Sequence, residues 1–125
     1  MTCPFCTSTH TFIASNESAF AIADGFPISK GHTLVIPKRC VESLFDLDDN
    51  ERERVWDLVN EVRSLLHDAH SADGFNIGLN DGAAAGQTVM HAHVHVIPRY
   101  IDDCDDPRGG VRWICPERAD YWSEQ

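Results

Sequence analysis

The sequence is poor in basic residues. Its 125 residues include 10 Lys and Arg against 20 Asp and Glu, so the formal net charge is -10 at pH 7. Binding to a nucleic-acid backbone needs clustered Lys and Arg side chains, and this balance therefore argues against it. A nucleotide ligand stays compatible with the composition, because backbone amides, histidines and a metal ion can hold a phosphate without a basic surface.

Long apolar runs are also missing. No stretch approaches the roughly 18 apolar residues that a membrane-spanning helix requires. The opening MTCPFCTSTH has no charged start followed by an apolar run, so we expect no secretory signal, no membrane partner and a cytoplasmic location. With 125 residues, 42% of them hydrophobic and 24% charged, the chain suits one globular domain over residues 1–125 rather than two.

The cysteines do not suggest a disulfide framework, because there are five of them and two form a Cys-x-x-Cys opening. Cys3 and Cys6 at this spacing can bind one zinc ion from a tight turn. A thioredoxin-like redox pair, the alternative, would need the motif after a strand and at a helix start within a βαβ pattern. Two unreactive thiols are the third interpretation. Cys104 and Cys115 show no ligand-like spacing.

Short segments rich in apolar and β-branched residues, bounded by turn-forming residues, predict strands. They are His10–Ala14, Phe20–Ala23, Thr33–Ile36, Phe75–Leu79 and the histidine-rich run described next, with Val111–Cys115 as the candidate for a last strand. One long helix is predicted from Asp48 to about His70, because Asp48 and Glu51 form a capping-box pattern and apolar residues recur with the helical period. An acidic loop and a C-terminal tail follow from about residue 101.

The most informative stretch is QTVMHAHVHVIPR, residues 87–99. His91, His93 and His95 alternate with apolar residues, which is the period of a β-strand, so we expect the three imidazoles on one face of a strand. Neighbouring histidines would lie about 6.6–6.8 Å apart and the outer two about 13 Å apart. Because zinc–nitrogen bonds are only about 2.0–2.1 Å long, two neighbours can share a zinc ion but all three cannot easily do so. A metalloenzyme with all three histidines as ligands is therefore disfavoured.

A loop of small residues, NDGAAAG at residues 80–86, leads into the histidine run. Small residues let backbone amides approach a phosphate closely. The loop matches neither the Walker A motif nor the dinucleotide-binding fingerprint, so on its own it is a weak signal of phosphate binding.

The pattern HAHVHVI resembles the signature of the histidine triad (HIT) superfamily. GHTLVIPKR at residues 31–39, Asn80 and AGQTV at residues 85–89 fit the same family, and the order and spacing agree from Cys3 to Tyr100. The resemblance implies an α+β, HIT-like fold with an antiparallel sheet of about five strands and one long helix. It also implies a homodimer.

The resemblance implies catalytic and nucleotide-binding roles for particular residues. His93 would be the nucleophile, and His95 and Thr88 would be the other catalytic residues. Asp24 would hold the ribose hydroxyls, and His32 would lie near the phosphate. The implied nucleotide-binding set is Asp24, His32, Asn80, Gly86, Gln87, Thr88, His93 and His95.

Zinc-bearing members of the superfamily usually have a histidine ligand where this sequence has Cys40. Because cysteine is also a competent zinc ligand, the substitution predicts a set of three cysteines and one histidine. Its members would be Cys3, Cys6, Cys40 and His91. Four protein ligands make a closed structural site, which would contribute folding free energy rather than chemistry. In the alternative, Cys40 is a small buried residue and no metal binds.

Neutral imidazole is a nucleophile near its own pKa, so it can attack phosphorus at neutral pH without a separate base. Together with the resemblance, this predicts a nucleotide hydrolase or transferase that forms a nucleotidyl-histidine. It would attack the α-phosphate of a nucleoside monophosphate ester, a phosphoramidate or a dinucleoside polyphosphate, with an AMP-type nucleotide as the bound part. Two alternatives stay open: a phosphorylase that uses phosphate as the acceptor, and a zinc-stabilised nucleotide-binding or interaction protein with little turnover.

Overall fold

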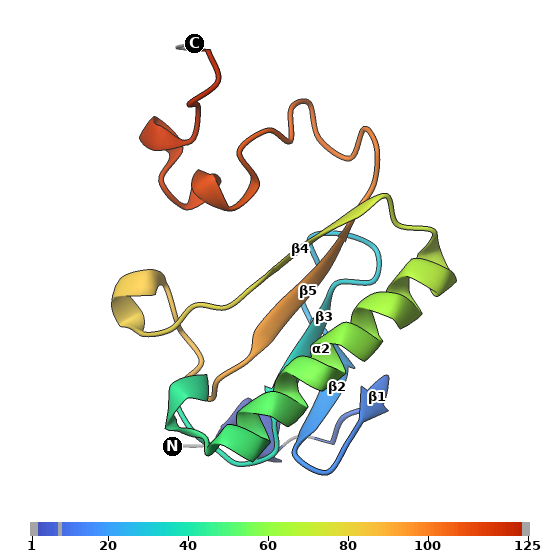
Figure 1. The fold of residues 1–125 in the computed structure, drawn as a ribbon, viewed down its shortest axis with the longest axis vertical. Coiled ribbons are helices and arrows are strands. Elements are labelled where there is room, and N and C mark those ends of the chain that lie inside the picture. Colours follow the sequence, from blue (N-terminus) through green and yellow to red (C-terminus); the bar gives the residue numbers. More distant parts are fainter. Residues whose placement is uncertain (1–2, 8, 124–125) are drawn as a thin grey trace.

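The computed structural model describes residues 3–7 and 9–123. Within them, five strands form one antiparallel sheet in the order β1-β2-β3-β5-β4, and one long helix, α2, lies across it (Figure 1). The elements are α1 (Pro4–Thr7), β1 (Ala14–Ser15), β2 (Ala19–Ala23), β3 (Thr33–Pro37), α2 (Asp49–His70), β4 (Gly74–Gly78) and β5 (Val94–Arg99). The predicted fold class is confirmed. None of the described helices is long and apolar enough to cross a membrane.

The long helix begins and ends at local sequence signals. Asp48 is its N-cap: the Asp48 carboxylate accepts a hydrogen bond from the backbone N–H of Glu51, and the Glu51 carboxylate accepts one from the N–H of Asp48. At the other end Ser71 adopts the left-handed conformation, with φ 53°, and its N–H donates to the carbonyl of His67. The predicted helix is therefore confirmed, with Asp48 as the cap rather than the first helical residue.

The core lies between α2 and one face of the sheet. Because side chains alternate along a strand, each strand contributes every second residue to this core and presents the others on the opposite face. The buried residues of α2 are Val55, Leu58, Val59, Val62 and Leu66, and the strand residues of the same cluster include Ala19, Ala21, Val35, Val94 and Val96. The opposite face has its own smaller cluster of Phe20, Ile22, Leu34 and Ile36, against which Phe5 packs. This second face carries the histidines.

The first predicted strand, His10–Ala14, is wrong in extent. Only Ala14 and Ser15 pair with β2, and residues 10–12 lie outside the sheet. Phe12 stacks on Phe20 with 4.9 Å between ring centroids. The apolar alternation of this segment therefore reflects packing of Phe12 on the sheet rather than backbone pairing.

The predicted last strand, Val111–Cys115, is helical instead. Two 3-10 helices, η3 (Gly110–Ile114) and η4 (Pro116–Arg118), follow the acidic loop, and the tail leaves the sheet (red in Figure 1). The side chain of Trp113 donates a hydrogen bond to the carbonyl of Arg108 at 2.7 Å. The aromatic residue thus packs within the tail, which explains an apolar pattern without strand pairing.

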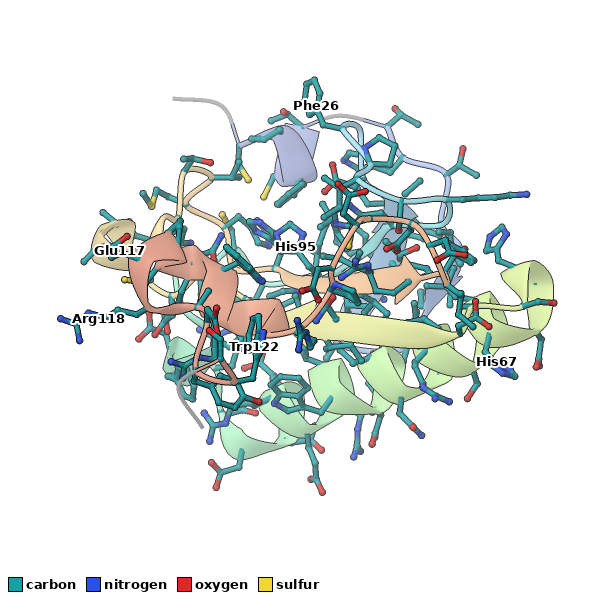
Figure 2. All side chains as sticks on the ribbon, turned by 90° about the horizontal axis from the view of Figure 1, so that it is seen from above. Phe26, His67, His95, Glu117, Arg118 and Trp122 are labelled. Carbon is teal, nitrogen blue, oxygen red and sulfur yellow. The ribbon has the colours of Figure 1, made fainter. Side chains whose placement is uncertain are left out.

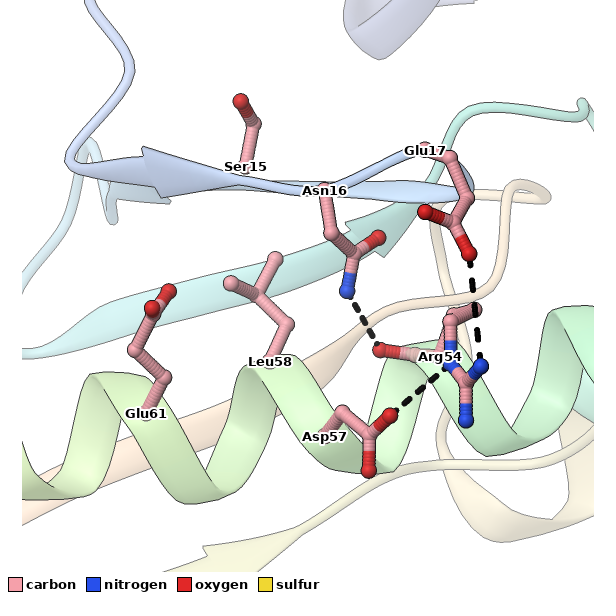
Figure 3. A pocket seen from close by; sticks show the side chains of 7 residues that line it. All are labelled: Ser15, Asn16, Glu17, Arg54, Asp57, Leu58 and Glu61. Atoms are coloured by element: carbon pink, nitrogen blue, oxygen red, sulfur yellow. Dashed lines mark hydrogen bonds and ion pairs between the residues drawn. The ribbon is translucent and has the colours of Figure 1, made fainter.

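A surface hollow lies between α2 and the turn that joins β1 to β2 (Figure 3). The side-chain amide of Asn16 donates to the backbone carbonyl of Arg54 at 2.8 Å. The guanidinium of Arg54 pairs with Asp57 at 2.8 Å and with Glu17 at 4.0 Å. Three of the charged residues that line this hollow are paired with one another, and no histidine lines it. The hollow therefore attaches the β1–β2 turn to α2 and is not the functional site.

Candidate active site and zinc site

The histidine strand begins later than predicted. Only His95 belongs to β5, and His91 and His93 precede it. The pairing of β5 with β3 stops at Val94, and its pairing with β4 stops at His95. No partner strand remains for the two earlier histidines, so the prediction of all three in one strand is wrong. The carbonyl of Pro37, at the end of β3, instead receives a hydrogen bond from the His91 ring at 2.7 Å.

Three polar side chains meet on the face of the sheet that α2 does not cover. Asp24 follows β2, His32 precedes β3 and His95 lies in β5; Figure 2 shows α2 on one side of the sheet and His95 on the other. His32 Nε2 lies 2.9 Å from His95 Nδ1 and 3.3 Å from Asp24 Oδ2. His95 Nδ1 lies 3.8 Å from the same carboxylate oxygen. The structure thus brings together three residues of the predicted nucleotide-binding set.

The hydrogen bonds of this group assign its tautomers. His32 Nδ1 accepts the backbone N–H of Ile28 at 3.2 Å, so the proton of a neutral His32 is on Nε2. This Nε2–H donates to His95 Nδ1, which therefore has no proton. His95 must then hold its proton on Nε2. The chain of contacts from Ile28 through His32 makes His95 a hydrogen-bond donor.

The electrostatics agree with neutral rings. Burial lowers the pKa of His32, and the Asp24 carboxylate opposes this only in part. Burial also lowers the pKa of His95, with further lowering by His93 and His32 and an opposing effect of Asp24. Both imidazoles are therefore neutral at pH 7, as the hydrogen-bond chain requires.

His93 lies beside His95, with 5.2 Å between ring centroids. Its Nδ1 lies 2.9 Å from the carbonyl oxygen of His91. A carbonyl only accepts, so Nδ1 carries a proton and donates it, and in the neutral ring the lone pair is then on Nε2. An unprotonated ring nitrogen is what a nucleophilic histidine needs. His93 and His95 therefore present one lone pair and one N–H side by side.

A second group forms around His91. Although far apart in the sequence, Cys3, Cys6, Cys40 and His91 each offer a ligand atom, and these atoms all lie within 4.8 Å of one another. His91 Nδ1 is 3.3 Å from Cys3 Sγ and 3.5 Å from Cys6 Sγ. Cys40 is exposed, so its alternative interpretation as a small buried residue is wrong. The structure thus brings together the four predicted metal ligands.

This donor set fits a zinc ion. Zinc–sulfur bonds of about 2.3 Å and zinc–nitrogen bonds of about 2.0–2.1 Å at tetrahedral angles separate a sulfur from a nitrogen by about 3.5 Å. The distances from Cys3 and Cys6 to His91 agree with this spacing. The bond from His91 Nε2–H to Pro37 leaves the Nδ1 lone pair free for a metal. Burial, opposed by that hydrogen bond, lowers the pKa of His91, so the ring is neutral as a ligand must be.

The thiols compete for protons when they lie this close together. Burial would raise the pKa of Cys3, but hydrogen bonds from the Cys6 thiol and from backbone N–H groups lower it. The pKa of Cys6 rises to about 12, because its thiol proton is shared with Cys3 and Cys40 and because burial and neighbouring negative charge add to the effect. A bound cation would remove this competition, since a coordinating thiol is deprotonated outright.

Gln87 fixes the loop between β4 and β5. Its side chain is buried, with Oε1 accepting the N–H of Gly82 at 2.8 Å. Its Nε2 donates to the carbonyls of Glu42 at 2.8 Å and Val89 at 3.0 Å. The amide thus closes the loop and attaches it to the segment that precedes α2.

The other predicted residues of this loop face solvent. Gly86 has φ 95°, in the left-handed region that favours glycine. Asn80 and Thr88 are exposed, and among residues 3–7 and 9–123 no hydrogen bond joins either side chain to a histidine. Both side chains are therefore accessible to a ligand, and no hydrogen bond of the described residues links them to the histidine group.

Phe5 is a residue of the site that the sequence reasoning did not assign. Its ring lies T-shaped against His93, with 5.3 Å between centroids and 72° between planes, and against His91 at 5.6 Å and 80°. The only signal in the sequence is its position inside the CPFC motif. The motif does not predict which residues the Phe5 ring contacts, because the contact joins residues almost ninety positions apart.

Comparison with known proteins agrees with the fold. A family model described as the HIT domain matches residues 7–102. This chain belongs to the HIT family. It is 48% identical over 77 residues to the bis(5'-nucleosyl)-tetraphosphatase (asymmetrical) of Schizosaccharomyces pombe, covering 62% of this chain and 42% of that protein. It is 38% identical over 92 residues to the bis(5'-adenosyl)-triphosphatase of Dictyostelium discoideum, covering 74% and 62%.

The chain spans between about two fifths and three fifths of the length of these two relatives. Among solved structures, a zinc-bound histidine triad family protein of Mycobacterium smegmatis superimposes with a TM-score of 0.74. The two chains are 36% identical, and the match covers 81% of this chain and 77% of the other. The HIT resemblance and the HIT-like fold predicted from the sequence are therefore confirmed.

Proposed function

We propose that this protein is a nucleotide hydrolase or transferase that attacks the α-phosphate of its substrate through His93. The observation that carries the proposal is the pairing of His93 and His95, in which one ring presents a lone pair and the other an N–H. Suitable substrates are nucleoside monophosphate esters, phosphoramidates and dinucleoside polyphosphates. The names of the relatives from S. pombe and D. discoideum support the last class.

In the first step the Nε2 lone pair of His93 forms a bond to the α-phosphorus. The bond from phosphorus to the leaving group breaks, and the leaving atom departs with the electron pair and takes up a proton from solvent. His95 Nε2–H donates a hydrogen bond to an oxygen on which negative charge develops, and His32 keeps that N–H in place. Because the ring of His95 is neutral, it acts here as a fixed dipole.

In the second step a water molecule attacks the same phosphorus and loses a proton to solvent, and the phosphorus–nitrogen bond breaks. A nucleoside monophosphate leaves, and His93 Nε2 regains its lone pair. If inorganic phosphate takes the place of water, the product is a nucleoside diphosphate, which distinguishes a phosphorylase from a hydrolase. Covalent catalysis is faster because it replaces one difficult displacement with two easier ones.

The remaining residues of the site would bind the nucleotide. Asp24 already accepts the N–H of Phe26 with Oδ1 and lies near His32 with Oδ2, and its carboxylate would also hold the ribose hydroxyls. Asn80, Thr88 and the backbone of Gly86 would contact the phosphates from the exposed loop. Gln87 would contribute by holding that loop, because its own amide is engaged.

We also infer a structural zinc ion held by Cys3, Cys6, Cys40 and His91. The gathering of the four ligand atoms supports it, and so does the zinc-bound relative from M. smegmatis. When bound, zinc supplies a cross-link between the N-terminal turn and the residues around 40 and 91, with no open position for chemistry. A homodimer of one-domain subunits is part of the proposal on family grounds, and light scattering after gel filtration tests it.

The deciding experiment is intact mass spectrometry after a brief quench with diadenosine tetraphosphate or an adenosine phosphoramidate. Wild-type protein should show a transient adenylyl adduct and release AMP, and His93→Ala should show neither. His67→Ala, which removes an exposed histidine of α2, is the matched control and should behave as wild type. Measurable AMP binding without product from either compound would contradict the proposal and favour the binding-protein alternative.

A further inference from the structure

We propose that Phe5 is a positioning residue for His93, and that the cysteine site holds Phe5 in place. The inference rests on the proposed function, because the role of His93 as nucleophile belongs to that proposal. Phe5 lies in α1 between Cys3 and Cys6, so the residue that touches the nucleophile and two of the metal ligands occupy one helical turn.

The ring of Phe5 is one of two aromatic rings that contact the ring of His93. The His93 ring lies T-shaped against Phe5, at 5.3 Å and 72°, and against His95, at 5.2 Å and 64°. The hydrogen bond from Nδ1–H to the carbonyl of His91 fixes only one point of the imidazole. Rotation about the terminal side-chain torsion is broad in histidine, so a second constraint is needed to keep Nε2 in one direction. The two ring contacts supply it.

The attachment of Phe5 depends on the cysteines. The backbone hydrogen bonds of α1 are local, from the N–H groups of Cys6 and Thr7 to the carbonyl of Cys3. Beyond α1, the contacts of this turn in the described residues are those of the thiols with His91 and Cys40, one bond from the His10 ring to Pro4, and the packing of Phe5 itself. A four-residue helix is not stable alone in water. The cluster of thiols and His91 is therefore a long-range anchor of the turn that carries Phe5.

The reaction should respond to Phe5 because in-line attack depends on orientation. Small misplacement of a reacting group lowers the rate of a chemical step without weakening the binding of the bound part of the substrate. Loss of the ring should therefore lower the rate of adduct formation and leave AMP affinity unchanged. Loss of the ring should also let His93 exchange between its two tautomers. A purely structural role of Phe5 in packing would not predict this exchange.

The test compares Phe5→Leu with Phe12→Leu. Phe12 is the matched control, because it also packs on the outer face of the sheet, on Phe20, but has no ring contact with a histidine. Three quantities are measured: the single-turnover rate of the His93 adduct, the AMP dissociation constant, and the ¹⁵N shifts of the His93 ring at one fixed pH, assigned by comparison with His93→Ala. For Phe5→Leu we expect a rate about tenfold lower, unchanged AMP affinity and shifts of a tautomer mixture. Phe12→Leu should match wild type in all three.

The link to the metal site is tested on wild-type protein by the same ¹⁵N spectra before and after removal of zinc with a chelator. Removal should change the His93 shifts in the direction seen for Phe5→Leu, and zinc should remain bound at one equivalent in Phe5→Leu. Unchanged shifts in Phe5→Leu would overturn the positioning role, and unchanged shifts after chelation would overturn the dependence on the cysteines. Phe5→Tyr, which keeps the ring, should retain the wild-type tautomer and serves if Phe5→Leu does not fold. If wild type forms neither an adduct nor AMP, the proposed function fails while the spectra still decide the role of Phe5.

Discussion

His91 and His93 are two residues apart and make the same kind of hydrogen bond, but they leave different ring nitrogens free. Each ring donates one N–H to a backbone carbonyl, His91 to Pro37 and His93 to His91, and each keeps the other nitrogen free. In His91 the free atom is Nδ1, directed at the thiols. In His93 the free atom is Nε2, beside the N–H of His95. The nitrogen that stays free depends on which carbonyl lies within reach.

The comparison shows how one short segment serves a structural site and a reactive site at once. The alternation of the sequence makes the two histidines look equivalent. The end of β3 makes them different, because Pro37 offers a carbonyl to the first ring only. A metal ligand and a nucleophile therefore follow from backbone geometry rather than from residue type.

The largest effect should come from His93→Ala. The change removes the free Nε2 and leaves the cysteine cluster intact, so turnover should fall by about 1000-fold or more while zinc content and thermal stability stay near wild type. Steady-state kinetics with diadenosine tetraphosphate, zinc determination and a thermal melt check these outcomes together. Loss of zinc in His93→Ala would show that the two sites are not separable.

The reverse pattern is expected for Cys3→Ser. The change removes one thiolate ligand, so bound zinc should be lost and the free energy of unfolding should fall by about 3 kcal/mol or more. His93 keeps its carbonyl partner, so any activity that survives at low temperature should still pass through an adenylyl adduct. Metal analysis and urea unfolding measure the first two quantities, with Cys104→Ser, outside the cluster, as the control. Retention of one zinc equivalent in Cys3→Ser would exclude Cys3 as a ligand.

The sequence alone predicted those parts of the fold whose signals are local. The limits of α2 follow from Asp48, Glu51 and the helical period, which act within one turn or a few, and the strand at Thr33 ends at a proline. Strand limits that depend on a partner were wrong. The prediction failed at His10–Ala14, at Val111–Cys115 and at the start of β5, because pairing joins segments distant in the sequence.

In the candidate site, too, the sequence predicted some features and not others. Residue types and family resemblance selected Cys3, Cys6, Cys40 and His91, and the structure gathers them, although zinc binding itself stays a prediction. Tautomers were beyond the sequence, because each depends on a backbone group that the fold supplies: the N–H of Ile28 for His32 and two carbonyls for the other rings. The contact of Phe5 with His93 was beyond it for the same reason.

A smaller effect on the rate is expected for His32→Gln. His32 does not present a nitrogen to the substrate side in the hydrogen-bond chain, but it keeps the proton of His95 on Nε2. Glutamine cannot reproduce both bonds in the same geometry, so kcat should fall about 10- to 100-fold, as for other residues that orient a functional ligand. The adduct should still form on His93. A wild-type kcat in His32→Gln would show that the reaction rate does not depend on the tautomer of His95. The catalytic role would then be assigned to His93 alone.

The smallest effect is on the pH dependence of stability. Because burial lowers the pKa of His32 and His95 in the folded protein, the unfolded chain binds more protons as the pH falls toward and below the usual pKa of about 6.5. Their contribution is therefore complete above that pKa and is lost as the pH decreases, with Asp24 opposing the loss. Thermal melts of zinc-loaded protein at pH 7.5 and pH 5.5 should show a lower Tm at pH 5.5, and a smaller difference in His32→Gln. Because both proteins keep His91 and its thiols, the change in this difference reports on the Asp24–His32–His95 group alone. An equal difference in both proteins would assign the pH dependence to the cysteine site instead.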